Sequence, residues 1–538
     1  MAVFTIIYLV WRIGWTLPLD HRPIDIVFAF ILLLTELVGV WEMAVHYMLE
    51  SKRESCPPMP EINNDKQLPD VDVLVPTCGE PVELLKRTLS GCLAMEYSGS
   101  VNVYLCDDAD REEMRALAKE LGVKYFSRKE RTNAKAGNLN NALKLTKAPL
   151  VAVFDADMCP EPHFLMSTVP YFYEKSGKHK RYQFSDKIGF VQTPQSFRND
   201  DLFQRAYRAG DLIPNEQDYF YLELEPARNS SNAVIFGGSN TVLLRKALES
   251  SGGFVTGTLT EDFATGIEIQ KHGYRCIAVD TPLASGLAPE SLTAMIRQRN
   301  RWARGCIQSG FKTHLLFTSK LTAAQRFGYL AAVTYWYAPL KRLIYLLAPL
   351  MYSVFGITVM RCDFRQMLMF WLPMYLMAAL GIRFFSGGIR SSWWSDIYEV
   401  CMFPFLLPGV LAETFGIKKK QFNVTDKSGK KDWKLWYILP FLILTGLSIF
   451  GIVNIAARII GERTTIYLFL LFWLLFNLYE LLYALVFVLS CRKLPPQEER
   501  QFRLRRISDK IGLRMTLLHI LYRISKKQKR RKFYETFV

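Results

Sequence analysis

Two patterns of apolar positions divide the chain. Between residues 70 and 315, short apolar runs end in polar loops and alternate with amphipathic stretches such as REEMRALAKELG at 111–122. Outside this region, several apolar stretches reach the roughly 20 residues that a helix needs to cross a bilayer. The first pattern predicts a soluble α/β domain, and the second predicts membrane helices on both sides of it.

Six apolar or β-branched runs in the α/β region predict strands. They occupy residues 71–77, 101–108, 149–157, 188–194, 233–240 and 274–280. Continuous apolar strands that alternate with helices are typical of a largely parallel sheet covered on both faces. Such sheets bind ligands at the carboxyl ends of their strands. The acidic residues that follow these runs are therefore candidate site residues.

The membrane helices are predicted from length and flanking residues. Residues 3–17 predict a retained helix, because no small-residue cleavage site of a signal peptide follows the apolar stretch. The helix is short and contains Arg12, so it either spans the membrane or lies at the interface. A surface helix is predicted at 319–336, and spans are predicted at 24–48, 338–360, 366–384, 434–456 and 466–490. Glu36 and Glu42 lie inside the first span, so we expect them to face protein or a polar cavity.

Charge predicts the orientation of these helices. The net charge is +17, and the residues from Arg492 onward carry fifteen Lys and Arg against four acidic residues. A second basic segment, KKKQFNVTDKSGKK, ends at residue 431. If 391–416 lies along the interface, both basic regions and the α/β domain are cytoplasmic, as the positive-inside bias requires. If 391–416 spans, both basic regions are outside.

These patterns predict five regions. They are N-terminal transmembrane helices at 1–50, a linker at 51–69, a cytoplasmic domain at 70–315, a membrane region at 316–490 with a polar loop at 418–431, and a basic tail at 491–538. The tail is expected to lie on the anionic inner leaflet. It lacks the interleaved aromatics and modules of nucleic-acid binding proteins. The ten cysteines show no CxxC or zinc spacing, which argues for reduced thiols and against zinc or haem.

The stretch FDADMCP at 154–160 is a candidate metal site. Asp155 and Asp157 directly follow an apolar strand, where two carboxylates can share a divalent ion with a diphosphate. Mg²⁺ and Mn²⁺ prefer oxygen ligands, and Mg²⁺ usually takes one or two protein carboxylates together with substrate phosphates. A solvated turn is the alternative explanation of such a pair.

Three further stretches could contact a nucleotide. VPTCGEP at 75–81 places Thr77 and Glu80 after the first strand, and CDDAD at 106–110 places Asp107 and Asp108 after the second. These residues could contact a base or a ribose, although an acidic loop or helix cap also explains the aspartates. AKAGNLNNAL at 134–143 puts Lys135 at a helix start, which suits a phosphate.

Two further stretches could contribute a general base and a binding surface for a sugar. In TED, Thr260 could cap the next helix, with Glu261 and Asp262 in its first turn; capping alone explains the triplet, but Asp262 could also act as a general base. QRNRWARG at 298–305 places Gln298, Arg301 and Trp302 within about one helical turn. Arg suits a diphosphate and Trp offers a flat face to a sugar ring. The alternative is an interfacial Trp with basic flanks.

In chain order, VPTCGEP, CDD, AKAGNLN, FDAD, QTP, TED, APESL and QRNRW resemble the catalytic subunit of bacterial cellulose synthase. More broadly, they resemble the processive family 2 glycosyltransferases, which include hyaluronan and other β-glucan synthases. The resemblance covers roughly residues 70–490. The polar segment FNVTDK at 422–427 is similar to the FxVTxK gating loop of this family.

The resemblance implies a GT-A domain with a Rossmann-like α/β fold on the cytoplasmic face, above a multi-pass helical channel. UDP-glucose would be the donor, and a growing polysaccharide would leave through the membrane. Asp262, with Glu261 and Thr260, would be catalytic; Trp302, Gly238 and Ser239 would face the acceptor; Asp155 and Asp157 would hold Mg²⁺ or Mn²⁺. The nucleotide-sugar would contact Thr77, Glu80, Asp107, Asp108, Lys135, Asp155, Gln298, Arg301, Phe422, Thr425 and Lys427.

The sequence departs from the family pattern at Cys78, Gly79 and Gly237. The first two departures leave the uracil contacts open, and Gly237, near the acceptor, leaves the linkage open. A capsule, another non-cellulose β-glucan or a hyaluronan-like polymer is therefore an alternative product. A lipid glycosyltransferase that adds one sugar, and a transporter or channel with a nucleotide-sugar-sensing domain, are further alternatives. No cyclic-di-GMP-binding barrel is expected after the last span. The resemblance also allows a homo-oligomer or an accessory export subunit.

Overall fold

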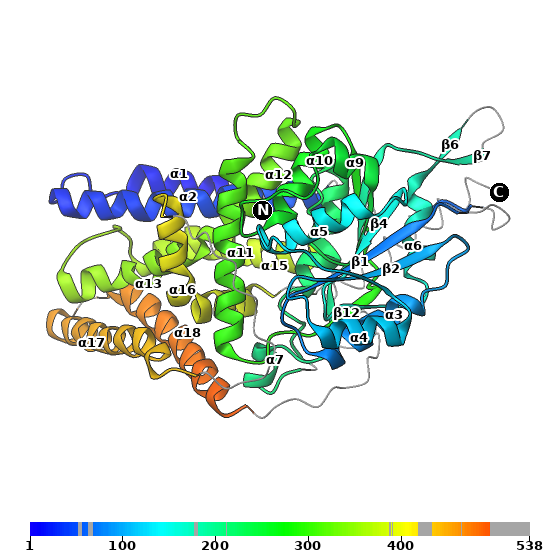
Figure 1. Ribbon diagram of the computed structural model, residues 1–538. Helices are drawn as coiled ribbons and strands as arrows, with labels where there is room; N and C mark the ends of the chain where they lie inside the picture. Colours follow the sequence, from blue (N-terminus) through cyan, green and yellow to red (C-terminus); the bar gives the residue numbers. More distant parts are fainter. Residues whose placement is uncertain are drawn as a thin grey trace.

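The computed structural model describes residues 1–51, 56–62, 68–176, 181–210, 212–386, 389, 391–417, 433–463 and 465–494. The predicted loop at 418–431, with Phe422, Thr425 and Lys427, lies outside the described residues, as does the tail from residue 495. A sheet-centred domain occupies one side of the molecule, and the helices α1, α2, α13, α17 and α18 extend from the other side (Figure 1).

A seven-stranded sheet forms the centre of the α/β domain, in the order β11-β8-β10-β4-β1-β2-β3. The strand β1 pairs in parallel with β2 and β4, and β11 pairs in parallel with β8, whereas β10 is antiparallel to both of its neighbours. The prediction of a mostly parallel sheet is thus confirmed. The strands are β1 Val71–Thr77, β2 Val101–Asp107, β3 Lys124–Phe126, β4 Leu150–Val153, β8 Ile188–Gln192, β10 Thr241–Leu244 and β11 Arg275–Ala278.

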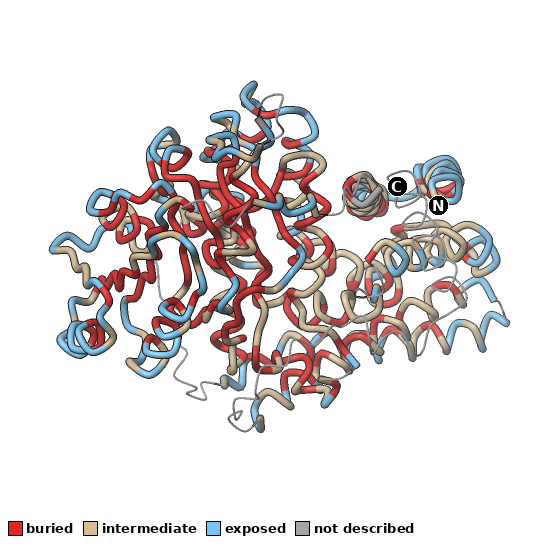
Figure 2. The backbone as a smooth tube through the Cα atoms, turned by 90° about the vertical axis from the view of Figure 1, so that its right-hand side faces the viewer, coloured by how far each residue is buried: buried red, intermediate tan, exposed pale blue. Residues whose placement is uncertain are grey.

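Helices cover both faces of this sheet. In Figure 1, α3 and α4 lie on one face, and α5, α9 and α10 lie on the other. Every residue of β1 and β4 is buried, which is why these strands carry apolar residues at consecutive positions. Figure 2 shows the buried residues concentrated in the sheet. The helices are α3 Val82–Leu93, α4 Glu112–Leu121, α5 Ala134–Leu145, α9 Arg245–Ser250, α10 Glu261–Lys271 and α11 Leu292–Lys312.

Short elements complete the domain at its edges. Two small sheets contain β5 Cys159–Pro160, β9 Ser196–Phe197 and β12 Ala284–Gly286 in one, and β6 Tyr173–Ser176 and β7 Arg181–Phe184 in the other. The short helical segments are α6 Phe164–Thr168, η1 Val169–Phe172, α7 Leu202–Ala206, the π-helix η2 Phe220–Leu224, α8 Glu225–Ala227 and η3 Arg228–Ser231.

The prediction of a strand at 233–240 is wrong. That segment is not a strand, and β10 begins at Thr241 instead. Two of its residues, Gly238 and Asn240, have positive φ values of +81° and +56°, which interrupt an extended chain. Its apolar residues are nevertheless buried. Side chains supply hydrogen bonds to its backbone in place of a neighbouring strand. The carbonyl of Val234 accepts hydrogen bonds from the Tyr329 hydroxyl at 2.9 Å and from Gln270 Nε2 at 2.8 Å.

The membrane region contains long apolar helices, which indicate a membrane protein. Five segments among the described residues are long and apolar enough to cross a membrane: 23–49, 364–385, 392–414, 435–462 and 468–493. The helical elements outside the α/β domain are α1 Ala2–Trp15, α2 Pro23–Ser51, α12 Ala323–Thr334, η4 Tyr335–Tyr337, α13 Ala338–Phe355, α14 Phe364–Gln366, η5 Met367–Trp371, α15 Leu372–Phe385, α16 Ser392–Thr414, η6 Leu435–Tyr437, α17 Leu439–Glu462 and α18 Leu468–Lys493.

The helix α16 differs from the other apolar helices. It is apolar enough to span, yet 56% of its most apolar 18-residue stretch is buried inside the protein. It packs on α11, α13 and α18. In Figure 1 it runs across the direction that α1, α2 and α13 share. Its apolar residues therefore serve protein packing as well as any contact with lipid, and its predicted position along the interface stays a prediction.

Several charged residues of the apolar helices have partners within the protein. Arg12 Nε donates to Glu36 Oε2 at 2.8 Å, and Lys341 on α13 contacts Glu42 on α2. Glu36 and Glu42 thus have protein partners, as predicted. Arg342 on α13 pairs with Asp396 on α16 at 2.5 Å. Lys341 and Arg342 also lower the hydropathy of α13, which is why this predicted span is not among the five most apolar segments.

Candidate active site

One large cavity lies at the carboxyl edge of the sheet and extends to the membrane helices. Its volume is about 1860 Å³. β1 and β2 end side by side, because Thr77 is in register with Asp107. The lining includes twelve of the predicted site residues, namely Thr77, Glu80, Asp108, Lys135, Asp155, Asp157, Thr260, Glu261, Asp262, Gln298, Arg301 and Trp302.

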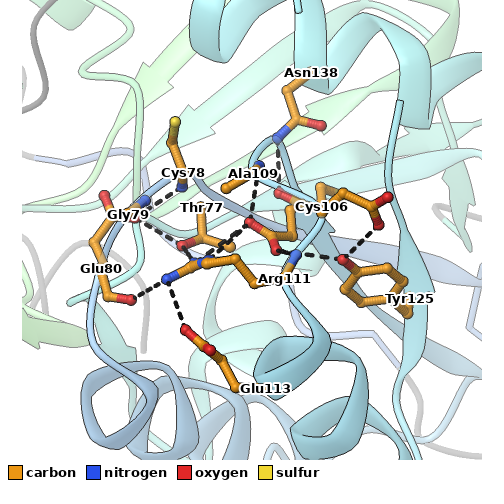
Figure 3. Close-up of polar contacts among 12 residues, drawn as sticks. Thr77, Cys78, Gly79, Glu80, Cys106, Ala109, Arg111, Glu113, Tyr125 and Asn138 are labelled. Atoms are coloured by element: carbon orange, nitrogen blue, oxygen red, sulfur yellow. Dashed lines mark hydrogen bonds and ion pairs between the residues drawn. The ribbon is translucent and has the colours of Figure 1, made fainter. Parts of the chain in front are cut away.

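The loop after β1 is closed by Glu80 (Figure 3). Its Oε2 accepts hydrogen bonds from the Thr77 hydroxyl at 2.7 Å, from Cys78 N at 2.9 Å and from Gly79 N at 3.1 Å. Burial alone would raise the pKa of Glu80, but these donors hold the pKa below its ordinary value. Glu80 is therefore a carboxylate that shapes the loop from within.

Asp107 supports the same region from behind the cavity wall. Its side chain is 0% exposed and is absent from the lining. It accepts hydrogen bonds from Ala109 N at 3.1 Å and Arg111 N at 2.7 Å. Arg111 in turn donates to the Thr77 hydroxyl at 3.0 Å (Figure 3). Asp107 thus ties the two loops together, and its predicted contact with a nucleotide stays a prediction that this placement does not favour.

Asp108 does line the cavity, and Arg128 holds it there. Arg128 donates to both oxygens of Asp108, at 2.5 and 2.7 Å. The same guanidinium donates to the carbonyls of Thr132 at 2.6 Å and Ala134 at 2.9 Å, which fixes the entry to α5. A Cβ at Gly137 would lie 2.1 Å from the Thr132 carbonyl oxygen. The glycine in AKAGNLN is therefore required by close packing at this turn.

Lys135, at the start of α5, joins the donor side of the cavity to the loop at 236–240. Its Nζ donates to Asp155 Oδ1 at 2.5 Å and to the Gly238 carbonyl at 2.8 Å. Asp155 is 38% exposed, whereas Asp157 is buried and its Oδ2 accepts from Leu287 N at 3.3 Å. Both carboxylates line the cavity.

Gly238 and Ser239 lie just behind the wall. A Cβ at Gly238, where φ is +81°, would stand 2.4 Å from Asp262 Oδ2. Ser239 is fully buried, and its hydroxyl accepts a hydrogen bond from Asp155 N at 2.8 Å. Gly238 therefore allows the loop to touch Asp262, and Ser239 supports the Asp155 turn. Their predicted contact with an acceptor remains a prediction.

Asp262 and Glu261 occupy the first turn of α10, as predicted, but the predicted capping role of Thr260 is wrong. The Thr260 side chain makes no cap hydrogen bond. Its hydroxyl instead lies 3.2 Å from the Ser309 hydroxyl on α11. A Cβ at Gly305 would approach the Thr260 hydroxyl to 2.7 Å, so α11 packs directly on this triplet. The tertiary contact with α11 outweighs the local cap.

The helix α11 forms the opposite wall. Gln298, Arg301 and Trp302 line the cavity together, as their spacing predicted. The Arg299 guanidinium lies 4.3 Å from the centre of the Trp302 ring and donates to Glu216 Oε2 at 2.7 Å. This stacking fixes the indole on one face. The cavity thus combines acidic, basic and aromatic groups in one space.

Comparisons with known proteins identify the family. Residues 69–305 match the model of the glycosyltransferase-like family 2, and residues 245–491 match the cellulose synthase model. Cellulose synthase 2 of Novacetimonas hansenii is 33% identical over 423 residues, which are 78% of this chain. The UDP-forming cellulose synthase catalytic subunit of Pseudomonas fluorescens (strain SBW25) is 32% identical over 480 residues, 88% of this chain. The chain is cellulose synthase-like.

The match covers only part of each relative. The aligned residues are 26% of the Novacetimonas protein, 63% of the Pseudomonas subunit and 60% of a cellulose synthase 1 catalytic subunit of Komagataeibacter xylinus. Among solved structures, the mannosyltransferase PcManGT from Pyrobaculum calidifontis, in complex with GDP-Man and Mn²⁺, is 16% identical. It superposes with a TM-score of 0.50 over 73% of this chain and 100% of its own. The fold is that of GT-A glycosyltransferases.

The acidic pair of this cellulose synthase-like chain has shifted pKa values. Burial and the neighbouring Asp262 raise the pKa of Glu261 to about 7. Burial also raises the pKa of Asp262, although Lys135 and Arg301 oppose the shift. Burial opposes protonation of Lys135, but Asp155, Glu261 and Asp262 together raise the pKa of its ammonium. The pair therefore holds its protons more tightly than ordinary carboxyls do, beside a firmly protonated lysine.

Sequence analysis missed the residues that hold this cellulose synthase-like site in shape. Arg111 and Arg128 bind the strand-end carboxylates. Gln192 organises the loop at 236–240, since its Oε1 accepts from Gly237 N at 2.8 Å and its Nε2 donates to the Ser239 carbonyl at 2.9 Å. The QTP motif contains Gln192, so its position after a strand was the available signal. The two arginines lie outside every motif.

Proposed function

We propose that the chain transfers glucose from UDP-glucose to the end of a β-glucan and moves the product across the membrane. The observation that carries this proposal is the continuity of the cavity. The same space is lined by Asp155 and Asp262 at the sheet and by Glu42, Trp394 and Tyr398 on the membrane helices. A product formed beside Asp262 can therefore pass toward the membrane without leaving the protein.

The donor end of the cavity suits a nucleoside diphosphate with a divalent ion. Asp155 and Asp157 supply carboxylate oxygens, and the Lys135 ammonium at 2.5 Å from Asp155 shows that this oxygen already attracts a cation. No group of three or more His, Cys, Asp or Glu side chains is placed to hold a metal among the described residues. Mg²⁺ or Mn²⁺ would therefore complete its shell with diphosphate oxygens and water.

The chain's own residues account for the transfer. Asp262 accepts the proton of the acceptor hydroxyl while the hydroxyl oxygen attacks the anomeric carbon of the donor sugar. One base suffices for inversion. Lys135 and Arg301 place positive charge at the diphosphate, which stabilises the leaving UDP. A bound divalent ion would supply further charge at the same oxygens. Trp302 offers a rigid ring face to the acceptor sugar.

The membrane end suits an extended, neutral polymer. Trp394 and Tyr398 on α16 line this part of the cavity, and Trp336 lines it from the helical turn before α13. Aromatic faces can stack on successive sugars without a fixed register. We therefore propose a multi-pass protein of the cell membrane, with the α/β domain and the tail cytoplasmic and the polymer leaving on the other side. The Phe422, Thr425 and Lys427 loop remains the proposed lid over the donor.

The proposal predicts that the purified chain in nanodiscs converts radiolabelled UDP-glucose into a polymer that is retained on a filter. Synthesis should stop when EDTA removes divalent ions and resume when Mg²⁺ or Mn²⁺ is added. Digestion with linkage-specific glucanases then assigns the bond. A product cut by cellulase supports a cellulose-like glucan.

Each rival predicts a different result in the same assay. A product that resists cellulase but is cut by another glucanase indicates a non-cellulose β-glucan. Transfer of a single sugar to lipid indicates a non-processive enzyme. Binding of UDP-glucose without release of UDP indicates a transporter or sensor, and it would overturn the proposed activity.

The proposed base also predicts a pH dependence. Asp262 accepts a proton only when it is ionised, and burial raises its pKa while that of Glu261 lies at about 7. We therefore expect kcat/KM to fall as the pH is lowered, with an acidic limb at higher pH than an ordinary aspartate would give. The rate of UDP release as a function of pH measures the profile.

A second variant tests the origin of that profile. Glu261→Gln removes the neighbouring carboxyl and keeps Asp262, so the acidic limb should persist in the variant if Asp262 is the base. Loss of the limb in this variant would assign it to Glu261 and contradict the role of Asp262.

A further inference from the structure

A buried ion pair lies at the cavity wall, which Arg228 helps to line, and it lies outside every motif that the sequence suggested. Glu225 begins α8 and Arg228 begins η3, and their side chains are 2% and 4% exposed. Glu225 Oε1 lies 3.3 Å from Arg228 Nε. We propose that Glu225 and Arg228 are a positioning pair, which sets the cavity-lining segment at 235–237 in register with the membrane-side helix α12. This inference rests on the proposed function, because that segment borders the base.

The pair holds the segment by its backbone. Glu225 Oε2 accepts the Ile235 N–H at 2.9 Å. Arg228 Nη1 donates to the Ala233 carbonyl at 3.3 Å and to the Gly328 carbonyl, on α12, at 3.1 Å. One guanidinium therefore joins the segment to α12, and one carboxylate joins the segment to the same guanidinium. In a segment that has no strand partner, these bonds replace a ladder.

The helix α12 adds its own bonds to the same stretch of chain. The Tyr329 hydroxyl donates to the Val234 carbonyl at 2.9 Å, and Gln325 Nε2 donates to the Asn232 carbonyl at 2.9 Å. A Cβ at Gly328 would lie 3.0 Å from the Ala233 side chain, so the two backbones run close together. Movement of α12 would therefore carry residues 232–235 with it.

The helix α12 is itself anchored on the membrane side. Ala331 packs with Val45 and Leu49 of α2 and with Ala227, which lies between Glu225 and Arg228. The chain continues from α12 through η4 into α13. The positioning pair thus lies where α2, α12 and the cavity wall meet.

The other end of the segment reaches the base. Ile235, Phe236 and Gly237 line the cavity. The next residue, Gly238, approaches Asp262 so closely that a Cβ would stand 2.4 Å from its Oδ2. A displacement of the segment therefore changes the space in which the acceptor meets Asp262. The donor groups Asp155 and Asp157 follow β4, and the segment reaches Asp155 through Gly238 and Ser239, beyond the residues that the pair holds.

Two features indicate that the pair has a role beyond packing. The π-helix η2 at 220–224 ends directly before Glu225, and such bulges are frequent at functional sites. Burial raises the pKa of Glu225 to about 7 even though Arg228 opposes the shift, so a hydrophobic residue would be the easier occupant for stability alone. A charged pair here is consistent with a demand for one fixed geometry.

The test compares Glu225→Gln and Glu225→Ala with Asp72→Asn in nanodiscs. Asp72 pairs with Arg245 at 2.9 Å and is as deeply buried, but it lies at the start of β1, at the opposite edge of the sheet. We expect both Glu225 variants to bind UDP like the parent protein. The Ala variant should form polymer about tenfold to a hundredfold more slowly, because misplacement of a reacting group costs rates of this order. The Gln variant keeps an oxygen that can accept from Ile235 N. Its rate of polymer formation should therefore lie between those of the parent protein and the Ala variant.

Hydrogen–deuterium exchange provides a readout that needs no activity. Peptides that cover 232–238 and 325–331 should exchange faster in the Glu225→Ala variant and unchanged in Asp72→Asn. Unchanged exchange in these peptides would overturn the positioning role whether or not the protein makes polymer. A parent protein that forms no polymer, with faster exchange in the variant, would instead count against the proposed function alone. Equal rates of polymer formation in all variants would also overturn the inference.

Discussion

Replacing Asp262 by Asn is expected to lower polymer synthesis by about 10²–10⁴-fold, the contribution of a general base. The amide has nearly the same shape but cannot accept the proton of the acceptor hydroxyl. Asp262 lines the cavity beside Lys135 and Arg301, which would still hold the diphosphate. UDP affinity should therefore persist while synthesis is lost. Incorporation of radiolabelled glucose and calorimetric UDP binding measure the two quantities on the same preparation.

Asp70→Asn is the matched control for this experiment. Asp70 is exposed and precedes β1, at the edge of the sheet away from the cavity. It should leave both UDP binding and synthesis unchanged. If Asp262→Asn released UDP at the parental rate, the carboxylate would not be the base. If it lost UDP affinity as well, Asp262 would belong to the donor site.

The fold was largely predictable, because burial on both faces leaves a clear signal in the sequence. The run at 71–77 is apolar at most positions and forms β1 over the same residues. The failure at 233–240 has a physical cause. That segment is as buried as a strand, but Tyr329 and Gln270 satisfy its backbone, and both lie far away in the chain. Hydrophobicity reports burial, and it does not report which groups supply the hydrogen bonds.

The site was predictable where chemistry demands particular residue types at a strand end or on one helical turn. Asp155 and Asp157, and likewise Gln298, Arg301 and Trp302, line one cavity in the structure. The supporting contacts were not predictable. Arg128 and Asp108 are distant in the sequence, and nothing local marks their pairing. For the same reason Thr260 was expected to cap α10, whereas its hydroxyl meets Ser309 of α11.

Replacing Gly238 by Ala should lower polymer synthesis by about a hundredfold, because it displaces the base. At φ +81° the new Cβ would stand 2.4 Å from Asp262 Oδ2, closer than side chains tolerate. Either the carboxylate or the loop must move. The loop is held by Lys135 Nζ, which donates to the Gly238 carbonyl at 2.8 Å. Movement would therefore also disturb the lysine that contacts Asp155. Initial rates of glucose incorporation measure the loss.

Gly252→Ala separates this collision from backbone strain. Gly252 has a similar φ of +86°, but nothing lies within 4 Å of the Cβ that Ala would add. Both variants should lose stability to a similar extent, since a positive φ costs a non-glycine residue about 1–3 kcal/mol. Thermal denaturation should therefore show comparable shifts, whereas only Gly238→Ala should lose synthesis. Equal activity in the two variants would mean that the loop yields to the methyl group without moving Asp262, and the contact between Gly238 and the base would then have no part in catalysis.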